Sequence, residues 1–150
     1  MSDRLTSRWT ATAAEAYGPS GMKGRMGELL FYTILRENNL PARDFEEEKQ
    51  PQVQGIDIET NDHTIDVKSN LVDGMFFIEV DAAGWLFNPK KTSEIIAHID
   101  VASKEIVWYT REAARAKMRV ADRLVKITSD NFRSDFMSRS WDDLFAHLRS

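Results

Sequence analysis

The segment GIDIETNDHTIDVK, which runs from Gly55 to Lys68, decides the fold of this chain. Apolar and polar residues alternate over 55–59 and again over 64–68, which is the period of a half-buried strand. Between the two runs, residues 60–63 (Thr-Asn-Asp-His) are of types that favour a turn. The segment therefore predicts a β-hairpin whose loop is Asn61-Asp62.

The register of this hairpin predicts a polar face and an apolar face. With Asn61-Asp62 as the loop, Asp57 is expected directly opposite Asp66. On the other face, Ile56 is expected opposite Val67 and Ile58 opposite Ile65, and this face would be buried against a helix. Lys68 follows Asp66 on the same side of its strand, about 7 Å further along. The polar face would thus present two acids and one amine.

Two carboxylates placed across a strand pair repel each other, so a sequence selected only for stability would avoid the arrangement. A divalent cation removes the conflict, because Mg²⁺ binds one or two carboxylates together with waters and a substrate phosphate oxygen. An amine beside the cation can orient or deprotonate an attacking water, or neutralise charge that develops on phosphorus. Asp57, Asp66 and Lys68 therefore suit phosphodiester hydrolysis. The alternative is a solvated sheet face with an ordinary lateral ion pair.

The rest of the chain predicts helices and strands in alternation around this hairpin. A helix is expected from Met22 to about Asn38, because apolar residues recur there at three- and four-residue intervals. Further strands are expected at 76–80, 94–99, 105–109 and 124–128, and further helices at 110–118 and 141–148. The order predicts an α/β (α+β) fold with a central mixed β-sheet flanked by helices. We expect residues 1–20 to form an N-terminal arm and residues 21–150 a single domain.

Composition excludes several classes of protein. The chain of 150 residues has no cysteine, which removes disulfides and thiolate metal sites and suits a reducing compartment. It has no run of about 18 apolar residues, so a cytoplasmic location, in a bacterium or a phage-infected host, is expected. The net charge of -4 argues mildly against nucleic-acid binding, although acids that bind cations contribute to it.

At these residues the chain resembles the PD-(D/E)XK nuclease superfamily, whose restriction-endonuclease-like core is a mixed sheet flanked by helices. Asp57 matches the first acid, Asp66-Val67-Lys68 matches the (D/E)XK tripeptide, and Glu28 stands on a preceding helix where many members carry a glutamate. The likeness covers roughly residues 20–110. It departs from the family pattern where Ile56 replaces the proline and where only eight residues separate Asp57 from Asp66.

The resemblance implies a role for each matching residue. Asp57 and Asp66 would bind Mg²⁺, with Mn²⁺ as a substitute, and the carbonyl of Val67 would help. Glu28 would act on the metal directly or through water, and Lys68 would position the nucleophile. For Glu28 the alternative is a plain solvent-side residue of a helix. We expect these four side chains, Glu28, Asp57, Asp66 and Lys68, to be catalytic.

The resemblance also implies a substrate class. We expect a metal-dependent DNA endonuclease of homing or restriction type, or a Holliday-junction resolvase, acting on duplex or branched DNA. Cutting two strands usually needs two sites, so a homodimer or higher oligomer is expected. The compact size leans slightly towards a phage or mobile-element nuclease. The alternative is a non-catalytic nucleic-acid-binding or assembly protein on the same fold.

Four basic residues are candidates for contact with the nucleic-acid backbone. Lys23 and Arg25 lie within one turn of Glu28, and Lys90 and Lys91 lie in a polar loop, 88–93, that follows two aromatic residues. For each of the four, plain solvated charge is the alternative. His63, His98 and His147 have no spacing typical of a zinc site, so the sequence predicts no role for them.

Overall fold

The computed structural model describes residues 22–45 and 48–150. Residues 22–37 form the N-terminal helix, and its side chains Leu30, Phe31 and Leu35 are buried as the periodicity predicts. Beyond the helix, Asn39 adopts a φ of 62°, a left-handed conformation that asparagine takes more readily than most residues. The expected arm over residues 1–20 lies outside the described residues.

The central sheet has five strands in the order β1-β2-β3-β5-β6. These are β1 (Arg43–Asp44), β2 (Ile58–Thr60), β3 (His63–Lys68), β5 (Ile95–Ile99) and β6 (Ile106–Thr110). Only β3 and β5 pair in parallel, and the other neighbours are antiparallel. The sheet is therefore mixed, as the sequence predicts.

A second sheet pairs β4 (Phe76–Glu79) with β7 (Leu124–Ile127). Helix α2 (Lys49–Val53) precedes β2, α3 (Arg111–Lys117) follows β6, and α4 (Trp141–Arg149) ends the chain. Hydroxyl caps begin the last two helices, because Thr110 accepts from the Ala113 amide and Ser140 from the Asp143 amide.

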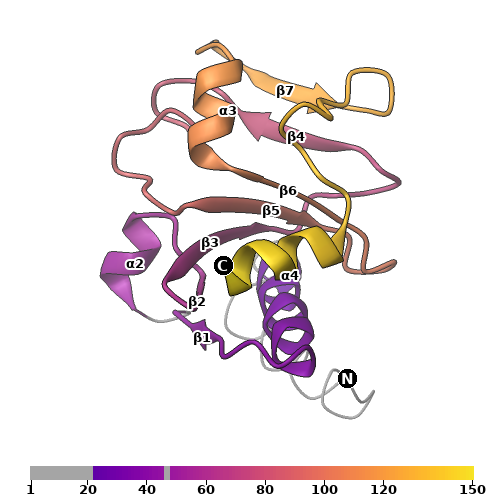
Figure 1. Cartoon of the computed structure of the whole chain (residues 1–150). Helices are drawn as coiled ribbons and strands as arrows, with labels where there is room; N and C mark the ends of the chain where they lie inside the picture. The colour runs from indigo at the N-terminus through magenta and orange to yellow at the C-terminus, as the bar shows by residue number, and fades with distance from the viewer. Residues whose placement is uncertain (1–21, 46–47) are drawn as a thin grey trace.

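Two apolar clusters pack on the two faces of the central sheet. On one face, Ile58, Ile65 and Val67 pack with the N-terminal helix and with α4, and the rings of Phe31 and Trp141 lie 5.5 Å apart. The other cluster joins β5, β6 and α3 to the second sheet. Figure 1 shows the N-terminal helix beside α4, while β4, β7 and α3 lie together at the other end of the molecule. The sheet is thus covered by different elements on its two faces.

The predicted hairpin register is confirmed where the two strands pair. Ile58 faces Ile65, Glu59 faces Thr64 and Thr60 faces His63, so the turn is Asn61-Asp62. Both turn residues have positive φ, 47° and 68°, which suits asparagine and aspartate. The apolar face formed by Ile58, Ile65 and Val67 is buried, as expected.

The structure differs from the sequence prediction in four elements. β1 and α2 were not expected, because the acidic stretch around them has no apolar period. β4 and β7 are strands, but they form a separate two-stranded sheet instead of joining the central one. Local alternation identifies a strand but not its partner, and pairing of distant segments depends on the tertiary structure.

At Gly27 the N-terminal helix packs tightly against Ser69, the residue that follows β3. A β-carbon there would lie 1.8 Å from the Ser69 hydroxyl, whereas one at Gly24 would meet no atom within 4 Å. We expect Gly27→Ala to lower the free energy of unfolding by about 1–3 kcal/mol through overpacking. Gly24→Ala, the matched control, should raise it by up to about 1 kcal/mol through helix propensity. Urea unfolding measures both, and equal effects would contradict this contact.

Within residues 22–45 and 48–150, no helix combines the length and the apolar character that a bilayer span requires.

Candidate functional site

Asp57 lies immediately before β2, where the hairpin ladder ends. Its amide donates to the Ile65 carbonyl at 2.9 Å, and its carbonyl accepts from the Phe45 amide at 2.9 Å. The side chain then replaces the next rung of the ladder, because Asp57 Oδ2 accepts from the Val67 amide at 2.8 Å. The simple register predicts Asp57 directly opposite Asp66, but the two residues do not pair on the ladder. The Asp57 side chain instead bonds to the next residue of β3. Ile56 is also off the ladder, and its amide bonds to the Pro51 carbonyl.

Asp66 is buried between two cations. It is 2% exposed, its Oδ1 lies 3.2 Å from Lys68 Nζ, and its Oδ2 lies 3.5 Å from Arg111 Nη2. The sequence predicted that Asp66 and Lys68 share a face, and the structure places them in contact. Asp66 Oδ2 nevertheless has no hydrogen-bond partner among the described residues. A buried carboxylate oxygen without a hydrogen bond is costly unless something else binds it.

Arg111, at the start of α3, is the cation that sequence reasoning missed. It is 3% exposed and donates through Nε to the Ser93 carbonyl at 2.9 Å and through Nη2 to Ser93 Oγ at 2.7 Å. It also donates to the Trp85 carbonyl. These bonds fix the guanidinium behind Asp66. No local pattern marks this arginine, because its partners come from a loop about 20 residues earlier.

Glu28 belongs to a chain of charges that leads from the N-terminal helix to Asp57. Arg25 Nη1 donates to Glu28 Oε2 at 2.6 Å and to Asp44 Oδ1 at 2.9 Å. Burial raises the pKa of Glu28, and the nearby Arg25 and a hydrogen bond with Asp57 only partly oppose it. Helix and hairpin thus bring Glu28 next to Asp57, although the two residues lie far apart in sequence.

Burial and the neighbouring acids both disfavour the charged form of Asp57. Burial raises the pKa of Asp57 well above its ordinary value, and the charges of Asp66 and Glu28 raise it further. The Val67 amide and Lys68 act in the opposite direction but do not compensate. The three acids therefore form a centre where an additional cation would be favourable.

Lys68 reaches the surface with its amine held on two sides. Its side chain is 28% exposed, and Nζ lies 4.5 Å from the centre of the Trp85 ring as well as beside Asp66. Next to Lys68 in the sheet is His98, which bonds to Asn70 Oδ1 and to the Tyr109 hydroxyl, each at 2.7 Å. Complete burial and the nearby Lys68 keep the pKa of His98 well below its usual range. His98 is thus a neutral support beneath the site.

The four basic candidates fall in different environments. Lys23 and Lys90 are exposed. Lys91 borders the acids, because a β-carbon built on Gly55 would lie 3.1 Å from Lys91 Cδ and 3.3 Å from Asp66 Oδ2. Arg25 is 8% exposed and bonded to Asp44 and Glu28. Its guanidinium therefore binds these two carboxylates and does not present its charge at the surface. The phosphate contact of Arg25 stays a prediction, and little of its side chain is exposed to make one.

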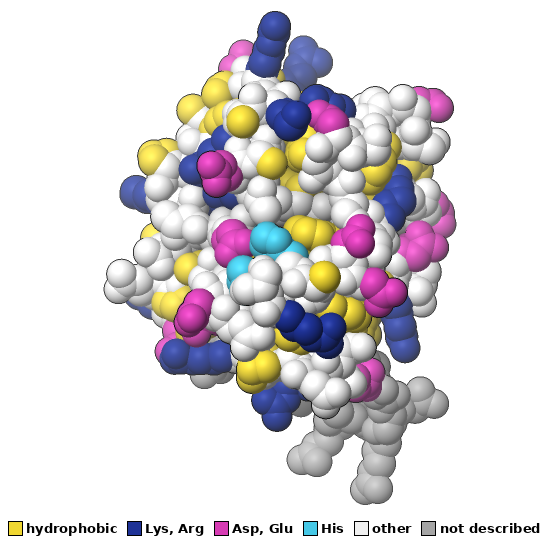
Figure 2. All heavy atoms as spheres, in the orientation of Figure 1, with side chains coloured by type: hydrophobic (Ala, Val, Ile, Leu, Met, Phe, Trp, Pro, Cys, Tyr) yellow, Lys and Arg dark blue, Asp and Glu magenta, His cyan; other side chains and the backbone are white. Residues whose placement is uncertain are grey.

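A second polar cluster lies at the other end of β3 and β5. His63 Nδ1 lies 2.7 Å from Glu94 Oε1, and His147 Nε2 lies 2.6 Å from Glu94 Oε2. Burial tends to raise the pKa of Glu94, but its bonds to His147 and His63 outweigh this and lower it. Figure 2 shows histidine side chains at the surface near the middle of this face, beside an acidic one. The sequence predicted no role for these histidines, because their spacing is not typical of a zinc site.

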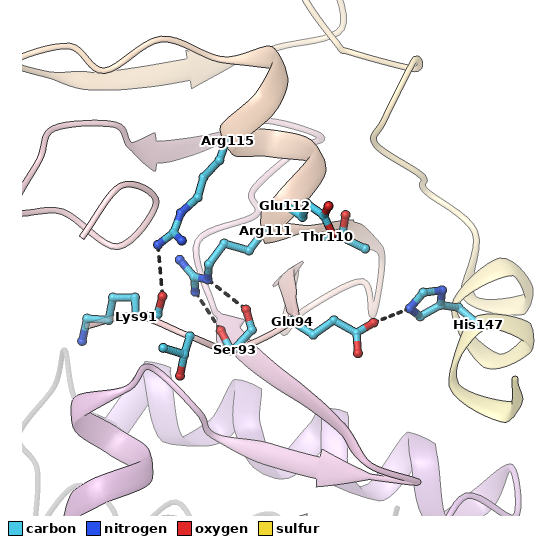
Figure 3. Close-up of a pocket in the computed structure, with 9 residues that line it drawn as sticks. Lys91, Ser93, Glu94, Thr110, Arg111, Glu112, Arg115 and His147 are labelled. Carbon is cyan, nitrogen blue, oxygen red and sulfur yellow. Dashed lines mark hydrogen bonds and ion pairs between the residues drawn. The ribbon is translucent and has the colours of Figure 1, made fainter. Parts of the chain in front are cut away.

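Glu94 and His147 also line a pocket of about 630 Å³. At its other end are Lys91, Arg111 and Arg115, and Figure 3 shows these side chains across from the pair formed by Glu94 and His147. Arg111 therefore contacts Asp66 on one side and borders this pocket on the other.

The two clusters differ in how closely their donor atoms converge. In the described part of the chain, only His63, Glu94 and His147 place three metal-binding atoms within 4.8 Å of one another. The carboxylate oxygens of Glu28, Asp57 and Asp66 do not converge as closely. Mg²⁺ tolerates this, because it usually keeps several waters and uses one or two carboxylates.

No protein-family model, curated protein or solved structure matches this chain.

Proposed function

We propose that this protein is a Mg²⁺-dependent nuclease that hydrolyses phosphodiester bonds in DNA. The observation that carries the proposal is the cluster at the open end of the β2–β3 hairpin. Asp57 and Asp66 lie together there, Asp66 Oδ2 has no hydrogen-bond donor within the described residues, and the Lys68 amine is 3.2 Å from Asp66 Oδ1.

The donor set fits a hard divalent cation. Asp57 and Asp66 supply carboxylate oxygens, which Mg²⁺ and Mn²⁺ prefer, and Glu28 supplies a third next to Asp57. The raised pKa of Asp57 means that burial and the neighbouring acids disfavour its charged form. A cation would offset this cost, so Asp57 and Asp66 would hold it, with Glu28 nearby. The part of the Val67 carbonyl stays a prediction.

A bound Mg²⁺ supplies Lewis acidity and lowers the pKa of a bound water. The residues of the chain supply position and charge. Asp66 and the face of the Trp85 ring fix the position of the Lys68 amine. The Lys68 side chain nevertheless remains partly exposed. It can orient an attacking water or donate to the charge that develops on the phosphate. Arg111 lies 3.5 Å from Asp66 Oδ2 and fixes this carboxylate on its buried side.

The basic residues around the cluster suit the DNA backbone. Lys91 borders Asp66, and Lys90 is exposed one residue earlier in the same loop. Lys23 is exposed and lies on the same N-terminal helix as Glu28. Phosphate contacts of this kind position a duplex without reading its sequence. We propose that the active form is a homodimer, because each chain carries one such cluster and duplex or junction cleavage needs two.

Incubation of the purified protein with linear, nicked, flap and four-way-junction DNA tests the proposal. We expect cleavage of at least one substrate with Mg²⁺ or Mn²⁺, and none with EDTA or with Ca²⁺ alone, since Ca²⁺ binds oxygen ligands with looser geometry. A catalytically inactive preparation that retains DNA binding would instead indicate a binding or assembly protein. Cleavage that persists in EDTA would contradict a metal-dependent mechanism.

A further inference from the structure

Three separate elements converge on the cluster of His63, Glu94 and His147. His63 begins β3, Glu94 directly precedes β5, and His147 lies in α4. The parallel pairing of β3 with β5 places the first two side by side, and the packing of α4 on the sheet brings the third. Their donor atoms all lie within 4.8 Å of one another. The cluster is therefore a product of the tertiary fold.

The donor set is of the kind that binds zinc. Two imidazole nitrogens and one carboxylate oxygen form a common three-ligand set for Zn²⁺. Bonds of 2.0–2.1 Å in a tetrahedral site place ligand atoms about 3.3 Å apart. The present separations of 2.7 Å and 2.6 Å, from His63 Nδ1 and His147 Nε2 to the two Glu94 oxygens, need to open by less than about 1 Å.

The ligands are already oriented by their surroundings. The Glu94 amide donates to Thr64 Oγ1 at 2.9 Å, and the Glu94 carbonyl accepts from the Arg111 amide at 2.7 Å. The His147 ring lies 5.4 Å from the Trp108 ring and 5.0 Å from the His63 ring. Little conformational entropy would therefore be lost when a metal binds.

The cluster is also accessible. The side chains of His63, Glu94 and His147 are 14%, 37% and 31% exposed. Glu94 and His147 line the same pocket as Lys91, Arg111 and Arg115, which lie across from them (Figure 3). A cation here would keep a coordination position that water or an anion from the pocket can fill.

We propose that His63, Glu94 and His147 form a binding site for a zinc-class divalent cation, with three protein ligands and a fourth position open to the pocket. The site is separate from the acid cluster of Asp57 and Asp66 and uses a different donor chemistry. It ties α4 to the N-terminal ends of β3 and β5. The alternative is a glutamate that merely bridges two histidines by hydrogen bonds.

Calorimetric titration of untagged, chelator-treated protein with Zn²⁺ tests the site. We expect one Zn²⁺ per chain, bound in the presence of excess Mg²⁺, because imidazole ligands favour Zn²⁺ over Mg²⁺. At a free Zn²⁺ concentration about 100 times Kd, the Tm should rise by about 5–10 °C. Co²⁺ should give the intense visible absorption of a tetrahedral site.

Matched variants separate this site from chance binding. Glu94→Gln, which can still hydrogen-bond to the histidines, and His147→Gln should each weaken Zn²⁺ binding at least about 10-fold. Glu112→Gln, an exposed acid at the same pocket, and Asp57→Asn, in the other cluster, should bind Zn²⁺ as the wild type does. Far-UV circular dichroism confirms that each variant is folded. Failure of the wild type to bind Zn²⁺ at one per chain, or equal binding by Glu94→Gln, would overturn the proposal.

Discussion

Asp57→Asn is expected to reduce Mg²⁺-dependent DNA cleavage by at least about 10³-fold without lowering the free energy of unfolding. The loss follows because a carboxylate ligand contributes several kcal/mol through the metal, and each 1.36 kcal/mol corresponds to a factor of about ten in rate. Stability should be kept because an asparagine oxygen still accepts from the Val67 amide, as Asp57 Oδ2 does at 2.8 Å. The substitution also removes a buried negative charge beside Asp66 and Glu28.

The measurements are initial cleavage rates at saturating Mg²⁺ and urea unfolding in EDTA. Asp62→Asn is the matched control, because Asp62 is an exposed acid in the turn of the same hairpin, where its φ of 68° suits asparagine. It should cleave at the wild-type rate. Full activity of Asp57→Asn, or loss of activity and stability in parallel, would indicate that Asp57 serves the fold and not the chemistry.

The pH dependence of stability gives the same variant a second readout. A carboxyl group whose pKa is raised in the folded state contributes stability that is fully present below its unfolded pKa of about 3.9. This contribution is lost as the pH rises through the folded-state pKa. Metal-free wild-type protein should therefore lose stability over that range, and Asp57→Asn should lose less of it. Mg²⁺ should restore stability to the wild type at neutral pH but not to the variant.

Arg111→Met is expected to have the largest effect on stability, a loss of about 3–5 kcal/mol in the free energy of unfolding. The guanidinium is 3% exposed and holds the Ser93 backbone and hydroxyl as well as Asp66. Methionine fills a similar volume but leaves the two Ser93 oxygens without this donor and Asp66 without its buried guanidinium. For a chain of this size the loss corresponds to a fall in Tm of about 10–15 °C, which differential scanning calorimetry can measure.

Two further substitutions test the reason for that loss. Arg119→Met, at an exposed position just beyond α3, should change the free energy of unfolding by no more than about 0.5 kcal/mol. The double variant Asp66→Asn with Arg111→Met should lose less stability than the two single variants summed, by about 1–3 kcal/mol, because the orphaned charge is removed together with its partner. Strict additivity would show that Arg111 and Asp66 do not interact.

Local pattern predicted much of the fold because strands and helices leave their period in the sequence. Alternation from Gly55 to Lys68, with a turn at Asn61-Asp62, determined the hairpin and the face that Lys68 shares with Asp66. The same reasoning located the N-terminal helix, α3, α4 and four further strand segments to within a few residues. These features depend on neighbours in the chain, so their physical causes are visible in a single sequence.

Contacts between distant segments were decided only by the tertiary structure. The Asp57 side chain bonds to the Val67 amide and leaves the ladder. Arg111 contacts Asp66, and Arg25 binds Asp44 and Glu28. The meeting of His63, Glu94 and His147 has the same origin, since 31 and 53 residues separate Glu94 from its two partners. Side chains so far apart in sequence leave no periodic signal. The charges that the hairpin carries could therefore be read from the sequence, whereas the groups that surround and balance them became visible only once sheet and helices were packed together.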